Sequence, residues 1–254
     1  MAAIPTLELE DARRPSRERE TLVGERTRII NRMKSTLARL GIRNFRPNLR
    51  KAPERLGALR TPEGVALPAN TMAELQRDMA RLQLVKEQIG EIERMRLTRL
   101  AQPPAEAPHA MLILLARVIG VGIETADMLV SEVFMRHLRD RRAVARYAGW
   151  TGAPDESGAR RREKGLARAG NARVPHGSSP WAEGPRGMLQ LAWRFLMFQK
   201  DSALAQWFQR RAADRRPGTR KTMIVALARK LLIALWRLVT TGEVPQGVVL
   251  RAAA

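Results

Sequence analysis

One serine in the middle of the chain stands where its hydroxyl could act on a phosphate. Ser157 lies in the stretch DESGARRR, between the acidic pair Asp155 and Glu156 and the arginines Arg160–Arg162. A serine attacks a phosphodiester only when its proton is removed and positive groups stabilise the charge on the phosphate oxygens. The arginines could meet the second requirement. A serine next to a glycine is more commonly a turn residue, so the residues alone leave both interpretations open.

The segment that follows Ser157 is strongly basic. Between residues 160 and 173, six cationic residues accompany one glutamate, a net charge of +5: Arg160, Arg161, Arg162, Lys164, Arg168 and Arg173. Gly165 and Gly170 interrupt helix, so we expect an irregular segment, with Asn171 in it, that lines a phosphate-binding surface. A second stretch, 210–230, holds eight Lys and Arg, Lys221 among them, against Asp214 alone. Both predict a nucleic-acid partner.

A glycine pair upstream predicts another phosphate contact. The segment MLILLARVIGVGIETADMLVSEV, residues 111–133, is typical of two short helices joined by a tight turn at Gly120 and Gly122. This is the pattern of a helix-hairpin-helix, whose backbone N–H groups and second helix approach a DNA phosphate. Any tight helical hairpin also needs glycine, so a purely structural role stays open.

Two long helices are expected ahead of these segments. From Ser16 to about Leu40, apolar residues recur at helical spacing, and Gly41 stands where the helix should stop. A second stripe has near-heptad spacing: Met72, Leu75, Met79, Leu82, Val85, Ile89 and Ile92. The stripes predict a two-helix coiled-coil arm over residues 16–100, after a disordered N-terminus over 1–15. The arm pairs either within one chain or with a second chain as a homo-oligomer.

The remainder, residues 110–250, is expected to form a helical domain. No alternating strand pattern of any length appears, so the predicted fold class is all-α: the arm, then a domain that contains the helix-hairpin-helix. Residues 151–158 are expected to be a loop because they include two glycines and a proline. The segment PHGSSPWAEGP, residues 175–185, has the composition of an irregular insertion.

Composition narrows the class of protein. The 254 residues carry 46 Lys and Arg against 25 Asp and Glu, a net charge of +21 that favours a polyanionic partner. Cysteine is absent, which excludes disulfides and cysteine zinc sites, and the three histidines have no metal-ligand spacing. The N-terminus lacks the apolar core of a signal peptide, and the most apolar stretch contains three cationic residues. A cytoplasmic protein without a membrane span is predicted.

The order of these segments resembles a known family. VIGVGIETADMLVSEV, RDRRAVARYAGWTGAPDESG, RRREKGLARAGNARV, LAWRFL and KTMIVALARKLLIALWRLV follow one another as in insertion-sequence transposases of the IS110 and IS116 type. The likeness covers about residues 8–252, and the central ARYAGWTG, ESG and AGNAR are its most specific part. The two N-terminal helices resemble the coiled-coil linker of the same family.

The resemblance implies a transposase that recombines DNA with the help of a structured, guide-like RNA. Its serine, at the ESG position here held by Ser157, attacks the DNA and becomes linked to it. Four metal-binding acids belong to an RNase-H-like domain that this chain lacks, so Mg²⁺ is expected there and no cofactor in this chain. The 175–185 interruption is a second departure. Both favour a truncated copy that is inactive alone. The alternative is a non-catalytic nucleic-acid-binding protein, or an inhibitor that dimerises with full-length transposase.

Overall fold

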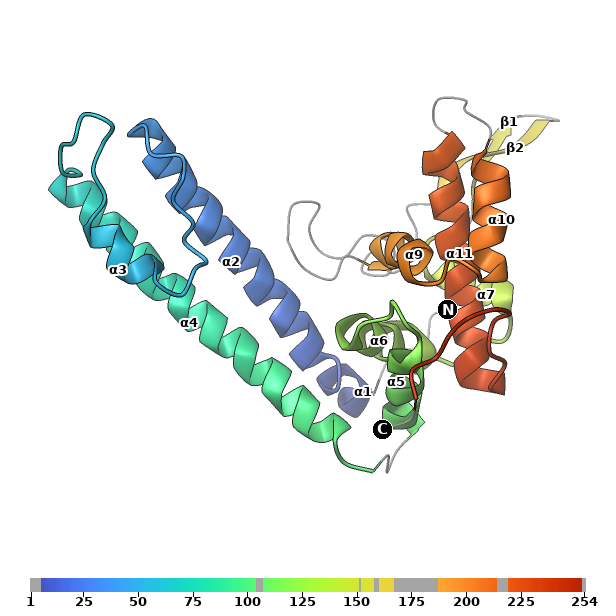
Figure 1. The fold of residues 1–254 in the computed structure, drawn as a ribbon. Coiled ribbons are helices and arrows are strands. Elements are labelled where there is room, and N and C mark those ends of the chain that lie inside the picture. Colours follow the sequence, from blue (N-terminus) through green and yellow to red (C-terminus); the bar gives the residue numbers. More distant parts are fainter. Residues whose placement is uncertain are drawn as a thin grey trace. The chain divides into compact units, whose positions relative to one another are not determined.

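The computed structural model describes residues 6–103, 107–150, 152–157, 160–166, 187–213 and 219–252, and for the two strands it describes the backbone. These residues form two compact units. One unit, here called the arm, comprises Arg17–Arg99. The other, here called the head, comprises the described residues before Arg17 and after Arg99. Figure 1 shows the helices of each unit.

The arm is a hairpin of two long helices, α2 (Arg14–Arg39) and α4 (Ala69–Leu100), joined by a connector that contains the short α3 (Ala52–Gly57) (Figure 1). The helices are antiparallel, since Arg19 in α2 pairs with Glu93 late in α4 while Arg32 pairs with Asp78 early in α4. The predicted stripe of α4 is buried from Leu75 to Ile92 against the stripe of α2. The apolar spacing therefore serves packing within one chain.

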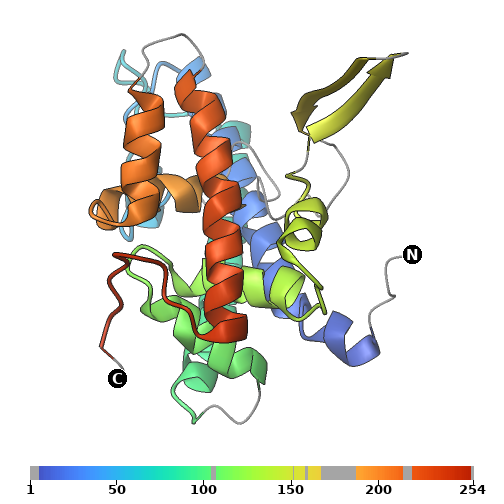
Figure 2. The ribbon, with the colours of Figure 1, turned by 90° about the vertical axis from the view of Figure 1, so that its right-hand side faces the viewer.

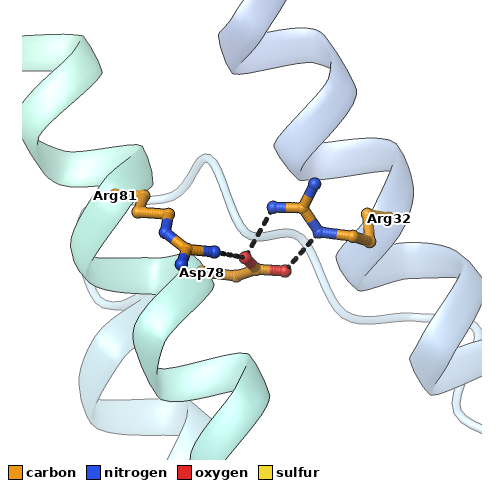
Figure 3. Close-up of polar contacts among 3 residues, drawn as sticks. All are labelled: Arg32, Asp78 and Arg81. Carbon is orange, nitrogen blue, oxygen red and sulfur yellow. Dashed lines mark hydrogen bonds and ion pairs between the residues drawn. The ribbon is translucent and has the colours of Figure 1, made fainter.

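A buried carboxylate ties the two arm helices together. The side chain of Asp78 is 2% exposed, and its two oxygens accept hydrogen bonds from Nε and Nη2 of Arg32 at 2.8 and 2.6 Å (Figure 3). Nη1 of Arg81, one turn further along α4, donates to the same carboxylate at 3.2 Å. The hydrogen bond from Arg32 lowers the pKa of Asp78 below its ordinary value. A fork-to-fork pair of this kind fixes the register of α2 against α4.

The lowered pKa of Asp78 predicts that the arm loses stability in acid. A carboxylate whose folded pKa is depressed adds stability above its unfolded pKa, about 3.9, which is lost as the pH falls through the folded pKa. We expect Asp78→Asn to cost about 2 kcal/mol at pH 7, the usual size for charge-assisted hydrogen bonds, and less at pH 3, which lies below the unfolded pKa. Urea unfolding followed at both pH values checks this. Equal costs at both pH values would contradict the ionic role of Asp78.

The head packs around one helix, α11 (Thr219–Thr241). It contacts α5 (Ala107–Arg117), α7 (Arg141–Tyr147), α9 (Gly187–Phe198) and α10 (Ala203–Ala212) (Figure 2). Between α5 and α7 lie α6 (Ile123–Leu129) and the π-helical turn η1 (Val130–Phe134). Trp150, Phe195 and Leu231 are among the fully buried side chains of this core.

One buried amide fastens the C-terminal segment to the head. Gln199, which is 2% exposed, follows α9 and donates through Nε2 to the carbonyl oxygens of Ile119 and Val249 at 2.8 and 2.9 Å. Its Oε1 accepts the N–H of Val249 at 2.9 Å. Val118 and Leu250 form an antiparallel bridge beside it. The turn after α5 and the end of the chain are thus held by the same side chain.

The helical fold class predicted from the sequence is confirmed, with one local exception. Gly152–Ser157 (β1) and Arg160–Leu166 (β2) pair as an antiparallel hairpin, whereas the sequence predicted a loop over 151–158 and an irregular basic segment after it. Hydrogen bonds between the two backbones form this hairpin, and the residue pattern did not indicate them. No helix among the described residues is long and apolar enough to span a membrane.

The N-terminus also differs from its prediction. Residues Leu7–Asp11 form the short helix α1, capped by the Thr6 hydroxyl, where a disordered segment was expected over 1–15. Arg13 is buried in the head, and its Nε donates to the carbonyl oxygen of Ser131 at 2.8 Å. Its Nη1 pairs with Glu10 at 3.1 Å. These contacts offset the cost of ordering a polar, charged segment.

Candidate nucleic-acid interface

The base of the β-hairpin is set by the end of α7. Asp140 caps the start of this helix by accepting the N–H of Ala143 at 2.7 Å, a hydrogen bond that lowers the pKa of Asp140. At the other end Gly149 has φ +72°, and the N–H of Trp150 reaches back to the carbonyl of Ala145 at 2.8 Å. This left-handed stop turns the chain so that Trp150 enters the core. The hairpin therefore starts two residues after a fixed, buried anchor.

The hairpin register brings Ser157 next to the basic run. Ser157 is the last residue of β1 and pairs with Arg160, the first residue of β2, while Glu156 pairs with Arg161 and Asp155 with Arg162. Directly opposed residues lie on the same face of a hairpin, and successive residues alternate between faces. Ser157, Asp155, Arg160 and Arg162 therefore share one face. Arg161 falls on the other face with Glu156.

This juxtaposition has a definite chemical character. One face combines a hydroxyl-bearing residue with two arginines, the residue type suited to the non-bridging oxygens of a phosphate. It also carries Asp155, a carboxylate that could accept a proton. Lys164 lies further along β2. Arg168, Asn171, Arg173 and the predicted 175–185 insertion lie outside the described residues.

Four arginines just before the hairpin escaped the sequence prediction. Around α7 the side chains of Arg139, Arg141, Arg142 and Arg146 are all exposed. Arg139 makes a loose ion pair with Asp140 at 3.4 Å, and no described acidic residue pairs with the other three. The run RDRRAVAR contains all four arginines, but it lies outside both basic segments predicted from the sequence. These cations extend the positive surface of the head up to the base of the hairpin.

The glycine turn between α5 and α6 has a packing role at its first position. Gly120 has φ +100° and is buried, and a Cβ there would lie 3.5 Å from the Phe198 side chain of α9. A left-handed, covered position demands glycine whether or not DNA is bound. Gly122 is half-buried, and a Cβ on it would lie 3.8 Å from the Arg194 guanidinium. A phosphate contact at this turn stays a prediction, and Gly122 beside Arg194 is its better candidate.

The second predicted basic stretch divides between two helices. Arg210 and Arg211 are exposed in the last turn of α10, and Lys221 lies in the first turn of α11. Arg220 and Lys230 each sit over a tryptophan ring, of Trp193 and Trp207, at 5.2 and 4.8 Å. Such cation–π contacts orient the two cations along the head surface.

The described part of the head and arm does not form a metal site. Among the described residues, no group of three or more His, Asp or Glu side chains lies close enough together to hold a metal ion. Asp155 and Glu156 are adjacent in β1 and therefore fall on opposite faces.

Comparison with known proteins places these features in a family. Residues 113–175, which include α6, α7 and the β-hairpin, match the model of the transposase IS116/IS110/IS902 family. Over 262 aligned residues, 99% of this chain is 39% identical to a putative transposase, y4rJ, of Sinorhizobium fredii. These matches support an IS110-type transposase. It spans 63% of the length of that relative.

Proposed function

We propose that this chain binds DNA through the basic surface of the head and contributes Ser157 as the nucleophile of DNA strand transfer. The observation that carries the proposal is the register of the hairpin, which sets Ser157 on one face with Arg160, Arg162 and Asp155. The hairpin lies inside the segment that matches the transposase family. The exposed arginines of α7 and α10 supply further cations for phosphates.

The chemistry assigned to Ser157 conserves the number of phosphodiester bonds. Its hydroxyl oxygen forms a bond to phosphorus while the bond from phosphorus to one sugar oxygen breaks. The serine proton passes to a base, and the departing sugar oxygen takes up a proton. Arg160 and Arg162 stabilise the negative charge on the non-bridging oxygens during the exchange. No external energy source is needed, because one phosphate ester replaces another.

The proposal places the nucleophile in this chain and the metal-binding acids in another domain. The described residues hold no metal cluster, so we assign the metal-binding acids, with Mg²⁺, to another domain that acts together with this chain. A structured RNA that pairs with the DNA would set the target, because the exposed arginines of α7 suit phosphates, and phosphate contacts carry no sequence information. The chain alone is therefore expected to bind DNA and to leave it uncut.

The test is covalent capture of DNA with a matched serine control. The chain is incubated in Mg²⁺ with a suicide DNA substrate, alone and together with the part of the Sinorhizobium relative to which it does not align. We expect a protein–DNA adduct only in the combined sample, lost at least a hundredfold in Ser157→Ala, because no other group replaces the attacking oxygen. Ser35→Ala, an exposed serine of the arm, is the control and should keep the adduct.

Binding is measured in the same variants to separate the two halves of the proposal. DNA affinity in Ser157→Ala should stay within a few-fold of the parent, since the serine carries no charge. An adduct that survives Ser157→Ala would remove the serine from the mechanism and leave it a turn residue. DNA affinity that does not fall as salt rises would remove the DNA-binding role of the head, because phosphate contacts release counterions.

A further inference from the structure

The arm carries a hollow at its connector end that the function of the head does not use. It encloses about 300 Å³ between one face of α2 and the turn at residues 46–49. The wall from α2 consists of Thr27, Ile30, Asn31 and Lys34, at spacings of three and four that place them on one side of the helix. The opposite wall is Arg46, Pro47, Asn48 and Leu49. The volume exceeds that of several water molecules, at about 30 Å³ each, and admits a phosphate group.

The lining of this hollow suits an anion. Lys34 and Arg46 line it from opposite walls, and the side-chain amides of Asn31 and Asn48 add neutral donors, whereas the Thr27 hydroxyl donates to the Val23 carbonyl at 3.0 Å. None of the residues that line it is acidic. Neither Lys34 nor Arg46 makes an ion pair or a side-chain hydrogen bond with any described residue, so both cations are free for a ligand. Two unpaired cations across a polar hollow form a site for a doubly contacted oxyanion.

The turn that forms one wall is held in place without a ligand. Gly41 ends α2 at φ +78°, where a Cβ would lie 2.6 Å from Pro62, and the N–H of Ile42 returns to the carbonyl of Leu37 at 2.9 Å. Phe45 and Pro47 are buried, which leaves the intervening Arg46 exposed. Nζ of Lys86 in α4 donates to the Asn48 carbonyl at 3.3 Å. The site is therefore formed before a ligand arrives, which lowers the cost of binding.

The charge around the hollow extends well beyond it. Residues 26–68 contain eleven Lys and Arg and two Glu, a net charge of +9. Four further cations of the connector are exposed: Arg43, Arg50, Lys51 and Arg55. A single carboxylate ligand would use only the hollow, whereas a chain of regularly spaced phosphates also uses the surrounding cations. Aromatic side chains for stacking on bases are lacking here, because Phe45, the one aromatic residue of this segment, is buried. The site thus contacts the sugar–phosphate backbone of its partner and does not stack on its bases.

We propose that this end of the arm is a second nucleic-acid site, in which Lys34 and Arg46 hold one phosphate of a double-stranded backbone and the connector arginines follow its neighbours. The site lies outside the proposed function, which rests on residues of the head. It makes the arm a nucleic-acid-binding element in addition to a spacer. Duplex DNA and duplex RNA share the phosphodiester chemistry, and the experiment below distinguishes them.

The site is tested in the full chain by crosslinking from single cysteines. The sequence has no cysteine, so one introduced thiol carries the only photocrosslinker. Leu49→Cys, at the rim of the hollow and 47% exposed, is the probe, and Met95→Cys, 56% exposed near the far end of α4, is the control. We expect Leu49→Cys to label duplex DNA, duplex RNA of the same sequence, or both, at least tenfold more than Met95→Cys does. If only one of the two duplexes is labelled, that nucleic acid is the one whose phosphates the site binds.

A charge-matched pair of variants supplies the second measurement. Lys34→Gln with Arg46→Gln should make the slope of log affinity against log salt shallower by about 1.8 on duplex DNA, or about 0.9 for each cation that no longer neutralises backbone phosphate charge. Arg94→Gln with Arg99→Gln removes the same charge from exposed positions of α4 outside the hollow and should change the slope by less than about 0.5. Labelling from Leu49→Cys no stronger than from Met95→Cys, or equal slope changes in the two double variants, would overturn the site. Neither outcome depends on Ser157.

Discussion

Replacing Leu82 by aspartate should unfold the arm while the head stays folded. Leu82 is 1% exposed and lies at the centre of the seam between α2 and α4. Losing a buried leucine costs about 2–5 kcal/mol, and an unpaired carboxylate in its place adds a desolvation penalty. The sum, about 5 kcal/mol or more, is comparable to the whole stability of a unit of this size. Circular dichroism should show the loss of the arm's helix, with a separate melting transition left for the head.

Leu84→Asp provides the matched control for this prediction. Leu84 is two residues along the same helix and is 55% exposed, so the same substitution should cost less than about 0.5 kcal/mol. The pair also separates packing from association when sedimentation is measured. If Leu82→Asp kept the helix content of the arm and only lowered the molecular mass, the stripe would face a second chain. The burial of the stripe by α2 of the same chain predicts the opposite.

The arm illustrates what apolar spacing can predict. A stripe with a period near 3.5 specifies a helix and the face that it buries, and the stripe from Leu75 to Ile92 is buried as expected. The spacing does not specify what covers that face, because α2 of the same chain and a helix of another chain offer similar side chains. In the structure α2 of the same chain covers the stripe, and the pair between Arg32 and Asp78 joins the two helices. Long-range pairs of this kind leave no mark in a single sequence.

The hairpin shows where the residue pattern lacked information. A half-buried strand is recognised by alternating apolar and polar residues, and neither GAPDES (β1) nor RRREKGL (β2) shows such alternation. The glycines and the proline of this segment predicted a loop, yet the backbone pairs from Gly152 to Leu166. The sequence nevertheless identified Ser157 and the adjacent arginines. What it could not indicate was which arginines share a face with the serine, since that follows from register.

The basic end of the arm was missed for a different reason. Its cations stand singly or, at Arg50 and Lys51, as one pair among apolar anchors such as Phe45 and Leu56, so no long charged block appears. The sequence predicted basic segments only at residues 160–173 and 210–230. The fold gathers Lys34 of α2 and Arg46 of the connector around one hollow, although they are separated by the end of a helix and a turn. Charge counted along a chain underestimates charge gathered in space.

Replacing Gln199 by leucine should destabilise the head by about 2–4 kcal/mol. The side chain of Gln199 makes three hydrogen bonds at 2.8–2.9 Å, to the carbonyls of Ile119 and Val249 and from the N–H of Val249. Leucine has a similar volume and no polar atoms, so the Ile119 carbonyl and the Val249 N–H lose these partners, while the Val249 carbonyl still accepts the Ile119 N–H at 3.3 Å. Each such group costs about 1–3 kcal/mol when it stays buried, and less if the C-terminal segment moves aside to reach water.

Two observables distinguish this fastening role from simple packing. Thermal unfolding of the head should shift down by about 5–15 °C, and the amide of Val249 should exchange its hydrogen much faster, because its acceptor is gone. Gln206→Leu is the control, since Gln206 is exposed and makes one hydrogen bond, to the Asp201 carbonyl at 3.2 Å. It should cost less than about 0.5 kcal/mol and leave the exchange of Val249 unchanged. If Gln199→Leu left that exchange unchanged as well, the C-terminal segment would be held by its bridge to Val118 and by Arg251, whose N–H donates to the Arg117 carbonyl at 2.7 Å. Faster exchange of the Val249 amide in Gln199→Leu would show that the Gln199 side chain holds the C-terminal segment. Because Gln199 also bonds Ile119, the same side chain links that segment to the glycine turn after α5.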